Sequence, residues 1–208
     1  MTEAEWLTWD DPRGMLAMLR DRASNRKLRL YACACCRRLD RLMSDPRNQE
    51  HLAVAERAAD GGVTAAELAQ KSRARPWFND PVGCALLPDP FVAADGTQYY
   101  AAKAVRKEVG NDEVNTAWVR ERAAQADLLR DLFCYPFHPR TFEAAWLTTA
   151  AVRLAAGIYR ERAFDRLPIL ADALEDAGCD DRAVLDHCRG PGPHVRGCWV
   201  VDLILGKQ

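Results

Sequence analysis

The sequence lacks features that would place it in or across a membrane. It contains no run of about 18 or more apolar residues, the length that a transmembrane helix requires. Residues 1–8 are polar and acidic, and so they lack the basic start and apolar core of a signal peptide. The formal net charge is −1, which gives no general attraction to nucleic acid or anionic lipid. We therefore expect a cytoplasmic protein without membrane contact.

Signals for β-structure and for phosphate binding are also scarce. Only Val195–Leu205 is apolar enough to fit either a buried helix or a strand, and no other alternating pattern could build a sheet. The one glycine-rich stretch, Gly190-Pro191-Gly192-Pro193, predicts a rigid turn, because its prolines remove the amides that would hold a phosphate. The sequence predicts an all-α protein, either a multi-helix bundle or a short helical array.

Helix start and stop signals are frequent. Asp11-Pro12 and Asp45-Pro46 each place an acidic cap before a proline suited to the first helical turn. Thr64–Glu67 has the pattern of a capping box, and a helix can begin near Ser24. Further helices are predicted over 98–107, 112–133, 149–163, 165–177 and 181–189.

Residues 74–97 are the exception to this helical pattern. Four prolines and two glycines interrupt the segment, so we expect an irregular proline-rich loop that packs through its apolar residues. It divides the chain into an N-terminal helical unit, 1–73, and a C-terminal helical unit, 98–208, although one continuous domain stays open as an alternative.

The sequence also matches itself at a constant offset of 140 residues. Between residues 3–30 and 143–170, eleven of 28 aligned pairs are identical, including Trp6 with Trp146. Chance at one offset would give roughly two identities. We interpret the match as a duplicated helical hairpin anchored by tryptophan, and we expect both copies to bury their apolar faces in a common interior.

Both ends of the chain resemble a known family. The opening M-T-E-A-E-W-L, the stretch from Arg26 to Arg38, and a tail that includes H-C-R-G-P-G-P-H-V-R-G-C-W over 187–199 are similar to a large paralogous family of uncharacterised bacterial proteins. The R-D-[IL]-F motif of that family corresponds to Arg130–Phe133, after which the two patterns diverge. The resemblance implies no established activity.

Metal binding is the strongest chemical hypothesis. Most of the eight cysteines are expected to be core residues in a reducing compartment, and this includes Cys33, Cys35 and Cys36. The tail, however, gathers donors that zinc accepts in tetrahedral sites. The candidate ligands are Cys179, His187, His194 and Cys198.

Two further constellations have a chemical interpretation and a structural one. Cys134 and His138 flank a proline turn and could form a thiolate–imidazole pair, but no glycine-rich oxyanion loop accompanies them. Asp172, Glu175 and Asp176 share a helix face, which could bind a cation or could simply be solvated. No convergent catalytic set emerges, and the sequence favours a protein that is not an enzyme.

Charge is unevenly placed along the chain. Residues 20–47 carry nine basic side chains against three acidic ones, a local excess of six. This stretch could contact phosphates, but intramolecular pairing or plain exposure is favoured. The leading functional hypothesis is therefore a helical adaptor for an unknown protein partner. A zinc protein that uses the tail is the first alternative, and nucleic-acid binding through residues 20–47 is the second.

Overall fold

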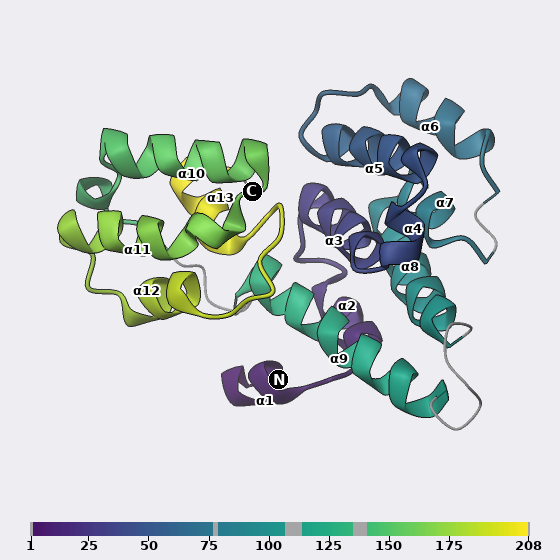
Figure 1. Cartoon of the computed structure of the whole chain (residues 1–208), viewed down its shortest axis with the longest axis horizontal. Helices are drawn as coiled ribbons and strands as arrows, with labels where there is room; N and C mark the ends of the chain where they lie inside the picture. The colour runs from purple at the N-terminus through teal and green to yellow at the C-terminus, as the bar shows by residue number, and fades with distance from the viewer. Residues whose placement is uncertain (1, 77–78, 107–113, 135–140, 208) are drawn as a thin grey trace. The chain divides into compact units, whose positions relative to one another are not determined.

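Helices make up all of the regular secondary structure in the part of the chain that the computed structural model describes, residues 2–76, 79–106, 114–134 and 141–207. These residues form thirteen α-helices and two short 3₁₀ helices, without a strand, which confirms the all-α prediction (Figure 1). None of the described helices combines the length and apolar character needed to cross a membrane. The chain divides into two compact units, Met1–Arg130 and Asp131–Gln208.

The N-terminal unit is assembled around α3 (Asn25–Arg37). Nine consecutive residues of this helix, 28–36, are buried, as expected of a helix that neighbours surround. Its main contacts are with α5, α7 and α8. The other helices of this unit are α1 (Glu3–Thr8), α2 (Pro12–Leu19), α4 (Asp40–Met43), α5 (Pro46–Ala59), α6 (Ala65–Arg73), α7 (Pro81–Ala85), α8 (Pro90–Val105) and most of α9 (Val114–Phe133).

Four of these helices begin with the same dipeptide. Asp11, Asp45, Asp80 and Asp89 each cap a helix through a side-chain oxygen that accepts a backbone N–H, and each is followed by a proline in the first turn. A proline there costs no hydrogen bond, because the first N–H groups of a helix have no partner inside it. The same signal that predicts α2 and α5 therefore also starts α7 and α8.

The structure thus corrects the predicted loop over 74–97. Residues 81–85 and 90–97 are helical, because their prolines begin helices and do not interrupt them. Both α7 and α8 pack against α3 and against each other, so this segment belongs to the core of the N-terminal unit. The division of the chain into two units accordingly falls between Arg130 and Asp131, within α9. The sequence had placed this division at the proline-rich segment.

A buried arginine holds the end of α7. The guanidinium of Arg29, which is 5% exposed, donates hydrogen bonds to the carbonyl oxygens of Ala85 (3.1 Å), Leu87 (2.8 Å) and Pro88 (2.8 Å). The last carbonyls of a helix have no partner inside it, so a buried helix end needs such a donor. Arg29 therefore acts as a structural residue of the basic stretch 20–47.

The C-terminal unit is a smaller helical array. It contains the end of α9, η1 (Ala144–Trp146), α10 (Thr149–Glu161), η2 (Phe164–Arg166), α11 (Leu167–Asp176), α12 (Arg182–Arg189) and α13 (Trp199–Leu205). In Figure 1, α11 lies beside α10 and α12, while α13 packs on α10. The tail that fitted a helix or a strand is helical, and it contributes Trp199, Val200, Val201 and Ile204 to the core.

The proposed duplication stays a prediction. Two pairs of matched positions nevertheless have the same pattern of solvent exposure. Trp6 in α1 is 0% exposed and Trp146 in η1 is 6% exposed, whereas Leu7 and Leu147, the next residues, are 56% and 37% exposed. The core cluster that holds Trp146 draws its described members from residues 134–205 alone, all in the C-terminal unit.

Candidate metal centre

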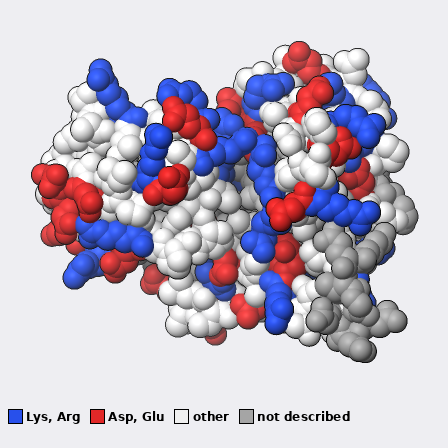
Figure 2. Space-filling view, viewed as in Figure 1, with Lys and Arg blue, Asp and Glu red and all other residues white. Residues whose placement is uncertain are grey.

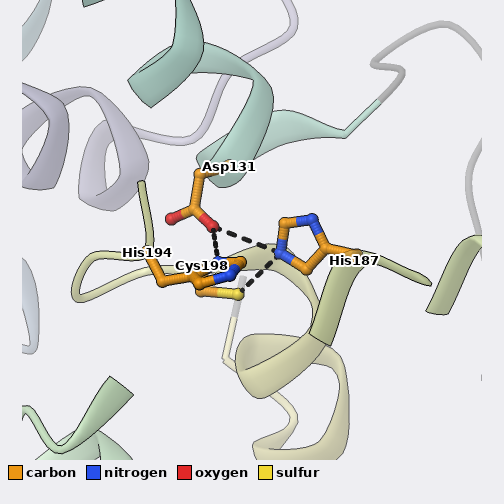
Figure 3. Close-up of side chains that lie close together, drawn as sticks. All are labelled: Asp131, His187, His194 and Cys198. Carbon is orange, nitrogen blue, oxygen red and sulfur yellow. Dashed lines mark hydrogen bonds and ion pairs between the residues drawn. The ribbon is translucent and has the colours of Figure 1, made fainter. Parts of the chain in front are cut away.

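Four side chains with metal-binding donors converge in the C-terminal unit (Figure 3). Asp131 lies near the end of α9, His187 lies in the last turn of α12, His194 follows in the turn after α12, and Cys198 is the N-cap residue of α13. One donor atom from each residue lies within 4.8 Å of the other three.

The individual distances are those of a small cluster around a common centre. Asp131 Oδ1 lies 2.9 Å from His194 Nδ1 and 3.2 Å from His187 Nε2. His187 Nε2 also lies 3.2 Å from Cys198 Sγ. Zinc–ligand bonds of about 2.0–2.3 Å in a tetrahedron place neighbouring donors roughly 3.3–3.8 Å apart. These three distances are shorter than that spacing, so the donors would move apart by roughly a few tenths of an ångström to hold an ion.

Hydrogen bonds from the backbone fix two of the donors. The backbone N–H of Val195 donates to Asp131 Oδ2 at 2.9 Å, which leaves Oδ1 directed at the histidines. His194 Nε2 lies 3.3 Å from the carbonyl oxygen of Gly190. A carbonyl only accepts, so Nε2 carries a hydrogen. Nδ1 is the nitrogen that faces the cluster, where it donates to the Asp131 carboxylate a hydrogen bond that a bound ion would replace. Such outer hydrogen bonds orient ligands in metal sites.

The turn after α12 brings His194 into place. Gly192 adopts φ +84°, and a Cβ atom at this position would lie 2.8 Å from the His194 backbone nitrogen. A side chain is therefore excluded here both by conformation and by space. The glycine–proline turn expected from the sequence thus presents His194 towards α9.

The site is largely closed to solvent. The side chains of Asp131 and His194 are 2% and 10% exposed, that of His187 is 18% exposed, and Cys198 is fully buried. The His187 ring packs against Trp199 with a centroid distance of 5.1 Å and against His194 with one of 4.8 Å. The imidazole of His187 is thus the most accessible of the four donors.

Burial and mutual contacts shift the acidity of these groups. Burial alone would raise the pKa of Asp131, but hydrogen bonds from His187 and His194 outweigh it, and the pKa is lowered. Burial opposes the charged form of His194, yet the contact with Asp131 raises the pKa of this histidine. Burial and the nearby Asp131 charge raise the pKa of the Cys198 thiol, although N–H groups of Val201 and Val200 act in the opposite direction. A cation at the centre would stabilise both the carboxylate and the thiolate.

The cluster agrees with the sequence-predicted ligand set at three positions and differs at the fourth. His187, His194 and Cys198 come together, whereas Cys179 lies outside the group. Cys179 precedes α12, whereas His187 lies in the last turn of that helix. Cys179 belongs to the apolar core instead.

Asp131 is the ligand candidate that sequence reasoning missed. Nothing in the spacing linked it to the tail, since Asp131 is 56 residues before His187. Cys188, the neighbour of His187 in the sequence, is fully buried in the core and lies outside the group.

The three cysteines of α3 are core residues. Cys33, Cys35 and Cys36 are 0–1% exposed, as the prediction of core packing requires. Burial raises the pKa values of Cys35 and Cys36, which disfavours thiolates. Cys134 is partly buried, and His138 lies outside the described residues.

The acidic face of α11 is engaged by an arginine. Arg189 Nη2 lies 2.8 Å from Asp172 Oδ1 and 2.6 Å from Glu175 Oε2. These carboxylates are 69% and 54% exposed, and the arrangement matches a solvated ion-pair cluster.

Many side chains of the basic stretch 20–47 also have partners within the N-terminal unit. Ion pairs join Arg26 to Asp60 at 3.0 Å, Arg37 to Glu56 at 2.6 Å and Arg38 to Glu121 at 3.2 Å. On the face drawn in Figure 2, basic and acidic side chains are intermixed. This pairing agrees with the intramolecular interpretation of the charge excess.

Comparison of the chain with protein-family models, with curated proteins and with solved structures finds no match in any of the three. The function is therefore inferred from the geometry of the site.

Proposed function

We propose that this protein is a zinc-binding helical protein whose C-terminal unit holds one ion between Asp131, His187, His194 and Cys198. The observation that carries the proposal is the convergence of these four donors, from four separate places in the chain segment 131–198, within 4.8 Å of one another. Three of them also stand in a region that the sequence alone marks as a candidate zinc site.

The donor chemistry favours zinc over other common cations. Two imidazoles, one thiolate and one carboxylate form a mixed nitrogen, sulfur and oxygen set, which zinc accepts in tetrahedral geometry. Magnesium and calcium prefer oxygen ligands alone and higher coordination numbers. The single sulfur and the close spacing therefore argue against both of these ions.

A structural role for the ion fits better than a catalytic one. Four protein ligands fill a tetrahedral shell, whereas catalytic zinc sites keep a position for water. The ion would join the end of α9 to α12, to the turn that follows and to the start of α13. Binding energy at such a site adds to folding energy, because the unfolded chain does not preform it.

The cluster also contains a thiol, an imidazole and a carboxylate, the groups of a nucleophilic triad. In a triad, one ring nitrogen faces the nucleophile and the other faces the carboxylate. Here the same atom, His187 Nε2, lies 3.2 Å from both Cys198 Sγ and Asp131 Oδ1. One nitrogen directed at two other donors is the arrangement of metal ligands and not that of a proton relay.

The decisive experiment measures zinc in the full-length protein purified without chelator, by elemental analysis. We expect about one equivalent in the wild type and a loss of at least roughly hundredfold in zinc affinity for Asp131→Asn. Cys179→Ser is the matched control, because this buried cysteine is a sequence-based candidate that lies outside the cluster; it should keep the ion. Zinc content below about a tenth of an equivalent, even after reconstitution, would refute the proposal.

Cobalt substitution supplies a second readout. A tetrahedral cobalt(II) site with a thiolate ligand has intense visible absorption together with a sulfur-to-metal charge-transfer band. We expect both in the wild type, and we expect Cys198→Ser to lose the charge-transfer band while Cys188→Ser keeps it. Equal spectra for the two variants would exclude Cys198 as a ligand.

An adaptor role for the helical array stays a prediction that is compatible with a structural ion. Recovery of a stoichiometric protein partner from native lysate would support it. Nucleic-acid binding through 20–47 is less well supported, since Arg26, Arg37 and Arg38 already have carboxylate partners.

A further inference from the structure

We propose that a cavity in the N-terminal unit binds an uncharged, planar aromatic molecule. The cavity has a volume of about 830 Å³, and it is lined by residues of α2, α7, α8 and α9. Sites for small organic ligands commonly occupy about 300–1,000 Å³. The cavity shares no residue with the zinc site, so either proposal can fail without the other.

Aromatic side chains form the wall between α8 and α9. The rings of Tyr99 and Trp118 have centroids 6.0 Å apart and are inclined at 80°, while Tyr99 and Tyr100 are 5.2 Å apart at 74°. In each edge-to-face pair the edge of one ring covers one face of the other ring, and the pair leaves the remaining faces uncovered. Stacking surface is therefore left for a further ring, which aromatic side chains stabilise in offset or edge-to-face geometry.

Large apolar side chains at this wall are unusually open to solvent. Tyr99 is 45% exposed and Val92, which also lines the cavity, is 51% exposed. Both project from α8, whose opposite side packs on α3 and α7. A bound ring would remove this apolar surface from water, which is the main driving force for ligands in sites of this kind.

The charges around the cavity favour a ligand without net charge. The two arginines that line it each face a carboxylate: Arg13 lies 3.7 Å from Asp95, and Arg122 is hydrogen-bonded to Asp11. An anionic ligand would have to compete with these carboxylates for the guanidinium groups. A cationic ligand would meet Arg106 and Arg122, which lie 5.5 Å and 5.7 Å from the Trp118 ring.

Three probes with one scaffold test this inference: indole, the anion indole-3-acetate and the cation tryptamine. Their dissociation constants are measured on the full-length protein by calorimetric titration. Saturation-transfer NMR identifies the ligand protons that contact the protein. We expect indole to bind most tightly. Trp118→Ala should weaken indole roughly tenfold or more through lost stacking, and Tyr99→Ala should do the same, whereas Tyr99→Phe should bind like the wild type.

Val119→Ala is the matched control, because Val119 adjoins Trp118 on α9, is 61% exposed and does not line the cavity. It should leave indole affinity unchanged. Thermal unfolding of each variant identifies any loss of fold, and Tyr99→Ala replaces Trp118→Ala as the decisive variant if the latter unfolds. The inference is overturned if indole shows no saturable binding, if a charged probe binds more tightly, or if folded Tyr99→Ala binds indole like the wild type.

Discussion

His194 donates a hydrogen bond from Nε2 to the carbonyl oxygen of Gly190, four residues earlier, at a distance of 3.3 Å. The other ring nitrogen, Nδ1, lies 2.9 Å from Asp131 Oδ1. A contact within one turn thus decides which atom of the ring faces α9. Outer hydrogen bonds of this kind orient the histidine ligands of metal sites.

Removal of zinc should destabilise the protein. An ion present at about 1,000 times its dissociation constant stabilises the folded state by roughly 4 kcal/mol. Excess chelator should therefore lower the unfolding temperature of the wild type, as measured by differential scanning calorimetry. Asp131→Asn should unfold at a temperature that chelator does not change. A wild-type transition that is indifferent to chelator would show that no stabilising ion was present.

Gly192→Ala should destabilise the C-terminal unit and reduce its zinc affinity. The residue adopts φ +84°, and its new Cβ atom would meet the His194 backbone nitrogen at 2.8 Å. We expect a loss of about 1–3 kcal/mol in the free energy of unfolding, from denaturant titration.

Gly157→Ala is the control for that variant. Gly157 lies inside α10, and a Cβ atom there would have no neighbour within 4 Å. The replacement of a helical glycine by alanine should stabilise the protein by about 0.5–1 kcal/mol. Equal effects of the two substitutions would contradict the role assigned to the turn.

Arg29→Ala should destabilise the N-terminal unit by roughly 3 kcal/mol, because three carbonyl groups at the end of α7 would lose a charged donor. Arg29→Lys should recover only part of this loss, since an ammonium group cannot reproduce the forked geometry. Arg47→Ala is the reference, because its ion pair with Asp45 is at the surface and should contribute little. Chemical unfolding curves for the three variants give the comparison.

Cysteine labelling should separate one thiol from the rest. Burial raises the pKa of Cys84 and of Cys188 to about 12, so neither thiol is reactive at neutral pH. Cys134 alone among the eight cysteines is not buried. Iodoacetamide at pH 7.5 should add about one label per folded chain, at Cys134, as mass spectrometry of peptides will show. Rapid labelling of Cys84 or Cys188 would contradict the described packing.

Local signals in the sequence predicted most helices, because capping chemistry acts over a few residues. Thr64 and Glu67 form the expected capping box, and Ser24 caps α3 through the N–H of Lys27. The proline-rich segment was predicted to be a loop although it contains the same local start signals. Its Asp80-Pro81 and Asp89-Pro90 pairs carry the same start signal as Asp11-Pro12, but the density of prolines suggested a loop.

The sequence by itself determined that the chain is helical, that its cysteines mostly belong to the core, and that its tail contains donors suited to zinc. All three follow from side-chain chemistry and from contacts between near neighbours in the chain. Tertiary structure alone decided that Asp131 replaces Cys179 beside His187, because the fold brings the end of α9 to the turn after α12. It also decided that the unit boundary lies within α9. The reason is that α7 and α8 pack on α3, and contacts between residues so far apart in the chain cannot be predicted from local sequence patterns.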